Sequence, residues 1–345
     1  MRILLTVDPE IPVPPTHYGG IERIVAALIA HLREAGHSVG LVAHPQSEVQ
    51  VDRLFGWPAL SSSGALNGVR NGLCLRAAIR AFAPDLVHSF SRLAYLLERL
   101  LRRAPTVMSY QREPSLDSIR LALRLSAGTL RLTGCSGYIV RQGERAGGRW
   151  SAIPNFVELA KFPFVAQVAA DAPLVFLSRI EAIKGAHWAI AIAKAAGRRL
   201  IIAGNRYPSG SGAEYFDQLI APELGRNGIE YIGEVDDLAK AKLLGQAAAM
   251  VVPIQWNEPF GIVFAEALAC GTPVISCPRG SLPEIIRPGE TGFLIESIDA
   301  GVAAVAKLSG LSRQACRERA ESTYSRAVVG RQYEALYRDC LGLNQ

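Results

Sequence analysis

The sequence has no long apolar run. No hydrophobic stretch among its 345 residues approaches the ~20 residues that a membrane-spanning helix needs. The apolar start at residues 3–7 is too short for a signal peptide, and Asp8 ends it. We therefore expect a cytoplasmic protein.

Several motifs that mark metal and redox chemistry are also missing. The six cysteines form no CxxC pair and no Cys/His cluster, which argues against a zinc site or a disulfide framework. No Asp-x-Asp triplet occurs, so we expect no metal and no other cofactor. No G-x-G-x-x-G follows the first apolar run, which makes a dinucleotide oxidoreductase unlikely as a class.

The composition indicates a two-domain α/β protein. With 49% hydrophobic and 20% charged residues, the chain is globular, and it is too long for one ordinary core. Apolar runs alternate with helical patterns, which predicts parallel sheets built from βαβ units. These runs lie at residues 3–7, 39–43, 86–87, 106–109, 134–135, 174–177, 199–203, 229–232, 250–253 and 274–276. The patternless stretch 165–173 is the expected linker, which predicts domains at 1–165 and 172–325 and a last helix at 326–345.

The charge is uneven along the chain. The net charge is +6, yet residues 1–165 hold 19 Lys/Arg against 12 Asp/Glu, and the remainder holds 18 against 19. Two segments, 92–103 and 118–132, have leucines at helical spacing with interleaved arginines, as membrane-surface helices do. The same pattern fits an amphipathic helix packed on a sheet with a solvated basic face. An anionic partner of the first half, with peripheral membrane contact, is one expectation.

Residues 257–274, NEPFGIVFAEALACGTPV, carry the most specific signal. A helix predicted over 260–270 has Glu258 before it and Glu266 within it, and Gly271 is its expected C-cap. The unpaired N–H groups of a helix start are suited to bind phosphate. A diphosphate bound there would have a carboxylate on either side, which is the layout of a sugar nucleotide. A helix with one exposed and one capping glutamate fits the pattern as well.

Other residues favour the ligand. Arg179 and Lys184 follow the apolar run 174–177 and form a plausible clamp for a pyrophosphate. Near the N-terminus, His17-Tyr18-Gly19-Gly20 precedes a helical pattern, and paired glycines let backbone approach a ligand.

These motifs together resemble the retaining glycosyltransferases of family 4, the group 1 glycosyl transferases. The resemblance covers nearly the whole chain through IPNFVELAKF (153–162), LSRIEAIKG (177–185), IEYIGEV (229–235), the two-glutamate segment, SLPEIIRPGETGFLI (281–295) and GRQYEALYRD (330–339). It implies the GT-B fold, in which two Rossmann-like domains face each other across a cleft. The first domain would then bind the acceptor and the second a nucleoside-diphosphate sugar, and the last helix would cross back to the first.

The resemblance also implies roles for single residues. Arg179 and Lys184 would neutralise the departing diphosphate, and Glu258 would contact sugar hydroxyls. Glu266 would hold the ribose. The diphosphate and sugar would be bound by the backbone of the remaining donor-side residues, which are Phe260, Gly261, Ile262 and Val263, with Gly19 and Gly20 closing from the other domain. The sugar would move to an acceptor hydroxyl with its anomeric configuration retained.

The acceptor side departs from the family pattern. Family members commonly carry a His-x-His pair where this chain has His88 and Phe90, and a further histidine where it has Gln111. Glutamine orients a hydroxyl but accepts no proton at neutral pH. His88 and Gln111 are therefore candidate acceptor-side residues. The acceptor is predicted to be a lipid-linked glycan, a lipopolysaccharide core or a small molecule, and no nucleic acid. An epimerase-like enzyme and a non-catalytic sugar-nucleotide-binding protein are the alternatives.

Overall fold

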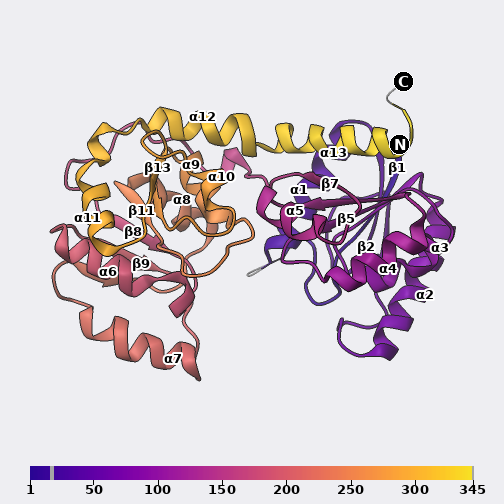
Figure 1. Ribbon diagram of the computed structural model, residues 1–345, viewed down its shortest axis with the longest axis horizontal. Helices are drawn as coiled ribbons and strands as arrows, with labels where there is room; N and C mark the ends of the chain where they lie inside the picture. Colours follow the sequence, from indigo (N-terminus) through magenta and orange to yellow (C-terminus); the bar gives the residue numbers. More distant parts are fainter. Residues whose placement is uncertain (16–18, 344–345) are drawn as a thin grey trace. The chain divides into compact units, whose positions relative to one another are not determined.

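A computed structural model of the protein describes residues 1–15 and 19–343 (Figure 1). The chain divides into two compact units. Unit 1 comprises residues 1–155 together with 326–345, and unit 2 comprises residues 156–325. His17 and Tyr18 of the predicted glycine loop lie outside the described residues.

Unit 1 is built on a seven-stranded sheet in the order β3-β2-β1-β4-β5-β6-β7, with parallel pairing throughout. Its strands are β1 (Arg2–Thr6), β2 (Ser38–Ala43), β3 (Arg53–Gly56), β4 (Leu86–Ser89), β5 (Thr106–Tyr110), β6 (Leu130–Gly134) and β7 (Arg149–Ala152). Its α-helices are α1 (Gly20–Glu34), α2 (Ala65–Phe82), α3 (Leu97–Leu101), α4 (Leu116–Ser126), α5 (Gly137–Glu144) and α13 (Arg326–Cys340). The 3-10 turn η1 (Leu93–Leu96) leads into α3.

Unit 2 repeats this plan with a six-stranded parallel sheet in the order β10-β9-β8-β11-β12-β13. Its strands are β8 (Leu174–Leu177), β9 (Leu200–Ala203), β10 (Ile229–Tyr231), β11 (Ala249–Val251), β12 (Val274–Ser276) and β13 (Gly292–Leu294). Its α-helices are α6 (Ala186–Ala195), α7 (Ser211–Tyr215), α8 (Asp237–Gln246), α9 (Ile262–Ala269), α10 (Leu282–Ile285), α11 (Ile298–Ala306) and α12 (Arg313–Tyr324). The predicted α/β class is confirmed in both units.

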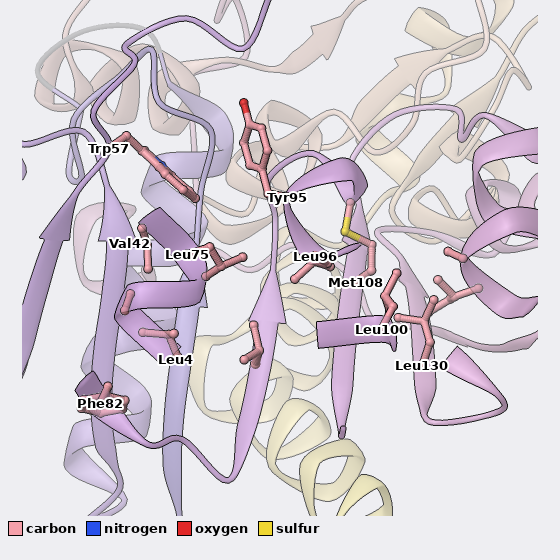
Figure 2. Close-up of a cluster of buried hydrophobic side chains, with 14 of the residues drawn as sticks. Leu4, Val42, Trp57, Leu75, Phe82, Tyr95, Leu96, Leu100, Met108 and Leu130 are labelled. Carbon is pink, nitrogen blue, oxygen red and sulfur yellow. The ribbon is translucent and has the colours of Figure 1, made fainter. Parts of the chain in front are cut away.

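The core of unit 1 lies where α2, α3 and α4 cover the sheet. Figure 2 shows Leu4 and Val42 from the central strands beside Leu75 of α2, with Leu100 of α3 and Met108 of β5 further along the sheet. These side chains are at most 5% exposed. Their burial removes apolar surface from water and so stabilises this unit.

The boundary between the units differs from the linker expected at 165–173. Residues 156–165 belong to unit 2 because they bond to its C-terminal segment: Val157 donates to the Tyr324 carbonyl at 2.7 Å, and Arg313 donates to the Val165 carbonyl at 2.7 Å. The last helix, α13, groups with unit 1, and Arg326 at its start pairs with Glu34 of α1 at 2.9 Å.

The helical patterns of the two basic segments extend over different residues in the structure. The glycine- and serine-rich sequence of residues 61–72 predicts a mobile loop, but residues 65–72 form the start of α2. The helical pattern over 118–132 stops at Ser126, and the alternation of residues 130–134 belongs to strand β6 instead. The 92–103 segment is helical over residues 93–101, as a 3-10 turn followed by the five-residue helix α3.

Candidate functional site

The two-glutamate segment lies after β11, and its helix begins later than predicted. α9 starts at Ile262, and Gly261 precedes it in a left-handed conformation with φ 72°. A Cβ on Gly261 would lie 2.6 Å from the Phe264 ring, so the chain needs glycine there. Phe260 is consequently a buried loop residue rather than the first helical one. The N-cap residue, Gly261, has no side chain with which to cap this helix start, and Gly261, Ile262 and Val263 are half-buried.

Gly271 ends α9 as predicted. It has φ 84°, and its N–H bonds to the Leu268 carbonyl at 2.9 Å. The next residue, Thr272, donates to the Ala267 carbonyl at 2.9 Å. This pattern is a Schellman-type C-cap, and it directs the chain into β12.

Lys184 and Glu258 form a buried ion pair. Lys184 Nζ lies 2.6 Å from Glu258 Oε2, and the two side chains are 9% and 11% exposed. The Trp256 indole N–H donates to the same carboxylate oxygen at 3.0 Å, and Lys184 Nζ lies 4.8 Å from the Trp256 ring centroid. The carboxylate is thereby held by two donors in a low-dielectric setting, where such contacts are strongest.

Two glycines bring these loops together. Gly185 has φ 79°, and a Cβ there would lie 2.1 Å from the Pro253 carbonyl oxygen, so the Lys184 turn packs directly on the backbone after β11. Gly280 has φ 61°, and its Cβ would lie 2.2 Å from the Glu258 carbonyl oxygen. That carbonyl also accepts the Ser281 N–H at 2.9 Å. The position of the ion pair therefore depends on backbone contacts from both sides.

Glu266 is buried inside α9 and pairs with a lysine of the neighbouring helix. Lys240 Nζ of α8 lies 2.9 Å from Glu266 Oε1 and 3.2 Å from Asp237 Oδ1. The Lys240 side chain is 18% exposed, so the pair lies near the surface of unit 2. A carboxylate is an acceptor for hydrogen bonds from hydroxyl groups.

Arg179 lies in the loop after β8 and is held by its own neighbours. Its Nη1 lies 2.8 Å from Glu181 Oε1 and 2.9 Å from the Tyr207 hydroxyl. Tyr207 in turn donates to Glu181 at 2.5 Å. The guanidinium side chain is 35% exposed, which leaves it accessible to an anion.

The glycine pair of unit 1 begins α1. Gly19 is the N-cap residue, and a Cβ there would lie 2.5 Å from Pro15 Cβ. The Gly19 backbone is therefore packed against Pro15 of the same chain. Gly20 behaves differently, because an added Cβ would meet no atom within 4 Å. Gly20 is exposed. Of the two glycines, Gly20 is the one whose backbone is accessible to a ligand.

His88 lies in the interior of unit 1 and not on an accessible surface. Its Nδ1 lies 2.6 Å from the Tyr337 hydroxyl of α13, and its Nε2 lies 2.7 Å from the Ser109 hydroxyl. The residue is 0% exposed, and burial lowers its pKa to about 3. The ring also packs in a tilted arrangement against the rings of Phe90 and Tyr333. In this arrangement His88 anchors α13 to the sheet and offers no free nitrogen to an acceptor.

Comparisons with known proteins identify the family. A model described as Glycosyltransferase Family 4 matches residues 18–161, and one described as Glycosyl transferases group 1 matches residues 165–323. The chain belongs to the family-4 glycosyltransferases. The matched structures have the GT-B fold, so the two units are its two Rossmann-like domains.

Relatives and solved structures agree with this assignment. A D-inositol 3-phosphate glycosyltransferase from Mycobacterium tuberculosis is 37% identical over 132 residues, which span 37% of this chain and only 27% of the relative. AviGT4, a glycosyltransferase involved in avilamycin A biosynthesis, is 27% identical with a TM-score of 0.75 over 99% of this chain and 98% of its own. A sucrose-phosphate synthase from Thermosynechococcus elongatus has a TM-score of 0.80 at 22% identity, over 99% and 100% of the two chains, and supports the fold alone.

In this family-4 chain the sequence-based reading missed several residues that surround the predicted ones. Glu181, Tyr207, Trp256 and Lys240 all bond to predicted site residues. Glu181 and Trp256 lie within a few positions of predicted site residues in the sequence. This proximity was the only sequence feature that could have pointed to them.

A further residue of unit 1 was also missed. Asp8 follows β1, and its Oδ1 is a buried oxygen with no hydrogen-bond partner among the described residues. Burial is the main cause that raises the pKa of Asp8, and the charge of Glu10 adds to it. Arg112 lowers the pKa, since its Nη2 lies 3.6 Å from Asp8 Oδ2. Gln111, the second acceptor-side candidate, precedes Arg112 and lines a cavity described below.

Proposed function

We propose that the protein is a retaining glycosyltransferase that moves a sugar from a nucleoside-diphosphate sugar to an acceptor hydroxyl. The observation that carries this proposal is the buried Lys184–Glu258 pair beside the uncapped start of α9. A cation, a carboxylate and a partly exposed helix start lie together, and these groups are complementary to a diphosphate that carries a sugar.

Each residue has a defined part in the proposed reaction. The start of α9 and Arg179 bind the diphosphate. Lys184 moves from Glu258 to a diphosphate oxygen and stabilises the charge that develops on the leaving group, an interaction type that is often the largest catalytic contribution. Glu258, once released, accepts hydrogen bonds from sugar hydroxyls, and Glu266 accepts them from the ribose.

The donor class is supported by related proteins. HepE from Anabaena, with a TM-score of 0.71 and 19% identity, has been solved in complex with UDP and glucose, and again with UDP-glucose. We propose a nucleoside-diphosphate sugar as the donor here too. We also propose that no metal is required, because Arg179 and Lys184 supply positive charge to the diphosphate and the sequence has no Asp-x-Asp motif.

The proposed acceptor is a lipid-linked glycan or a lipopolysaccharide core reached by peripheral contact with the cytoplasmic face of the membrane. The basic first half of the chain supports this, and a small soluble metabolite is the alternative. No helix in the described part of the chain is long and apolar enough to span a bilayer. Arg99, one of the basic residues of segment 92–103, bonds to the carbonyls of Asp85 and Pro105 and therefore serves the fold of unit 1.

A donor screen tests the proposed function. UDP-, GDP-, ADP- and dTDP-sugars are ranked by thermal shift, and release of the nucleoside diphosphate is then measured with and without candidate acceptors. We expect one donor to raise the melting temperature and to be turned over. Binding without turnover supports the non-catalytic alternative, and a product that is an isomerised donor supports the epimerase-like one.

A further inference from the structure

Unit 1 contains a cavity of ≈590 Å³ that the donor chemistry does not use. It lies between the segments that follow β4 and β5 and the helices α3 and α4. The two helices pack against each other, and Figure 1 shows where they lie in unit 1. Its volume falls within the roughly 300–1,000 Å³ typical of small-molecule sites. It therefore has room for a substantial part of an acceptor.

The wall of this cavity is mainly apolar. Its larger aliphatic side chains from η1, α3, β5 and α4 are Leu93, Leu97, Leu100, Met108, Leu121 and Leu125. A sugar needs hydrogen-bonding partners on most sides, and leucine and methionine side chains provide none. A hydrocarbon chain gains from the same wall, because each buried methylene is favourable by about 0.8 kcal/mol, or about fourfold in affinity.

The polar part of the lining is basic. Arg92 and Arg112 are its charged members, and no acidic residue is among the described residues that line the cavity. Both arginines are exposed, and Arg112 forms an ion pair with Asp8, with 3.6 Å between Nη2 and Oδ2. Gln111 adds a neutral polar group, as do the lining serines Ser91, Ser109, Ser115 and Ser118. This combination suits a phosphate attached to an apolar chain.

The cavity is bordered by leucines that are exposed to solvent. Leu97 of α3 and Leu121 of α4 line it and are nevertheless 50% and 57% exposed. Leu101, one turn after Leu97, is 57% exposed but does not line it. Arg103 and Arg124 on the same two segments are exposed as well. Apolar side chains with nearby arginines are suited to contact an anionic lipid surface.

We propose that this cavity binds the hydrocarbon chain of a lipid-phosphate acceptor, with Arg92 and Arg112 at the phosphate. The inference rests on the proposed function, since it places the acceptor in unit 1. It makes that proposal more specific, because it names a lipid phosphate as the acceptor class and α3–α4 as the side from which the chain enters.

Calorimetric titration with alkyl phosphates tests this proposal. The full chain is titrated with decyl phosphate and butyl phosphate below their micelle-forming concentrations. We expect decyl phosphate to bind at least tenfold more tightly, because about fourfold is gained per buried methylene. Equal affinities for the two chain lengths would overturn the proposal. Decyl maltoside, which has the same chain and a neutral head, should bind more weakly than decyl phosphate, and equal binding would overturn the role of the arginines.

Two matched variants locate the binding. Leu97→Glu places a charge in the cavity wall, and Leu101→Glu places one on the same helix outside it. Both positions are half-exposed, so both variants should fold, as a thermal melt verifies. We expect Leu97→Glu to weaken decyl phosphate binding at least tenfold and Leu101→Glu to change it less than twofold. Equal losses in the two variants would refute the cavity as the site, and Ala94→Trp, at an exposed lining residue, provides a second block of the same space.

Donor binding separates this inference from the proposed function. Titration with the nucleotide sugar selected by the donor screen should give the same affinity in the wild type and in Leu97→Glu. If the donor is bound and turned over but decyl phosphate does not bind, the lipid-phosphate inference fails and the glycosyltransferase proposal stands. If decyl phosphate binds in the cavity but no donor binds, the proposed function fails, and with it the acceptor role of the cavity.

Discussion

Replacing either partner of the Lys184–Glu258 pair should separate a role in donor binding from a purely structural one. The pair is about nine-tenths buried, with 2.6 Å between Nζ and Oε2. Removing one partner of such a pair costs about 3–5 kcal/mol, because a charge is left buried without compensation. Lys184→Met and Glu258→Gln should therefore both destabilise unit 2. At about 2–4 °C per kcal/mol for a unit of this size, a loss of about 3 kcal/mol lowers its melting temperature by about 6–12 °C.

The two variants should differ in nucleotide affinity. A hydrogen bond to a charged group contributes about 1.5–3 kcal/mol, so Lys184→Met should weaken binding of the free nucleoside diphosphate about 10- to 100-fold. Glu258→Gln should not weaken it, because the diphosphate carries no sugar for this side chain to contact and Lys184 loses a competing partner. Sugar transfer should fall in both variants, by roughly 100-fold in Lys184→Met.

Calorimetry with UDP, GDP and ADP measures these affinities, and thermal melts measure the stabilities. Lys194→Met is a suitable control, since Lys194 forms a more exposed pair with Glu223 at 2.7 Å. That variant should change neither quantity appreciably. If Lys184→Met and Glu258→Gln are equally destabilised and bind the nucleotide as the wild type does, the pair is structural and the proposed exchange of partners is refuted.

Three further predictions concern other parts of the molecule. Glu266→Ala should weaken nucleoside diphosphate binding by about 1.5–3 kcal/mol through the lost ribose contact, and unchanged affinity in calorimetry would contradict that role. The depressed pKa of His88, about 3 against an ordinary value near 6.5, means that its stabilising effect is complete above pH 6.5 and is lost as the pH falls toward 3. Its share of the loss is about 2 kcal/mol at pH 5, so urea unfolding should show a shallower acid decline in His88→Asn than in the wild type. Binding to anionic vesicles should fall steeply with salt and be abolished by Arg102→Glu/Arg103→Glu, whereas equal co-sedimentation with neutral vesicles at low salt would exclude the membrane contact.

The sequence predicted the central strands of both sheets because they are buried on both faces. Leu174–Leu177 is buried at every position and reads as a plain apolar run. The strands that were missed altogether, β3, β7 and β13, are all edge strands of their sheets. The interior strand β6 was predicted only at its last residue, because residues 118–132 were interpreted as one helical pattern. β3 and β7 are largely exposed and contain arginine, so their sequences lack the apolar signal.

The site was predictable in its residue types but not in its pairing. Family resemblance pointed to Lys184 and Glu258, yet their direct contact depends on two loops that are brought together by Gly185 and Gly280. Such backbone approaches leave no periodic trace in a sequence. His88 shows the converse. The family's His-x-His pattern suggested the acceptor side, whereas its partners, Tyr337 and Ser109, come from segments 249 and 21 residues away.

Sugar transfer in the presence of EDTA is the most direct test of the central claim. The wild-type protein is incubated with the donor found in the screen and with membrane lipid extract as the acceptor source, and release of nucleoside diphosphate is followed with and without the chelator. We predict acceptor-dependent release at the same rate in EDTA, because Arg179 and Lys184 provide the charge that stabilises the leaving diphosphate. Release that stops in EDTA and returns with magnesium or manganese would contradict the assignment of that role to these two side chains, and a donor that binds without any acceptor-dependent release would contradict transferase activity itself.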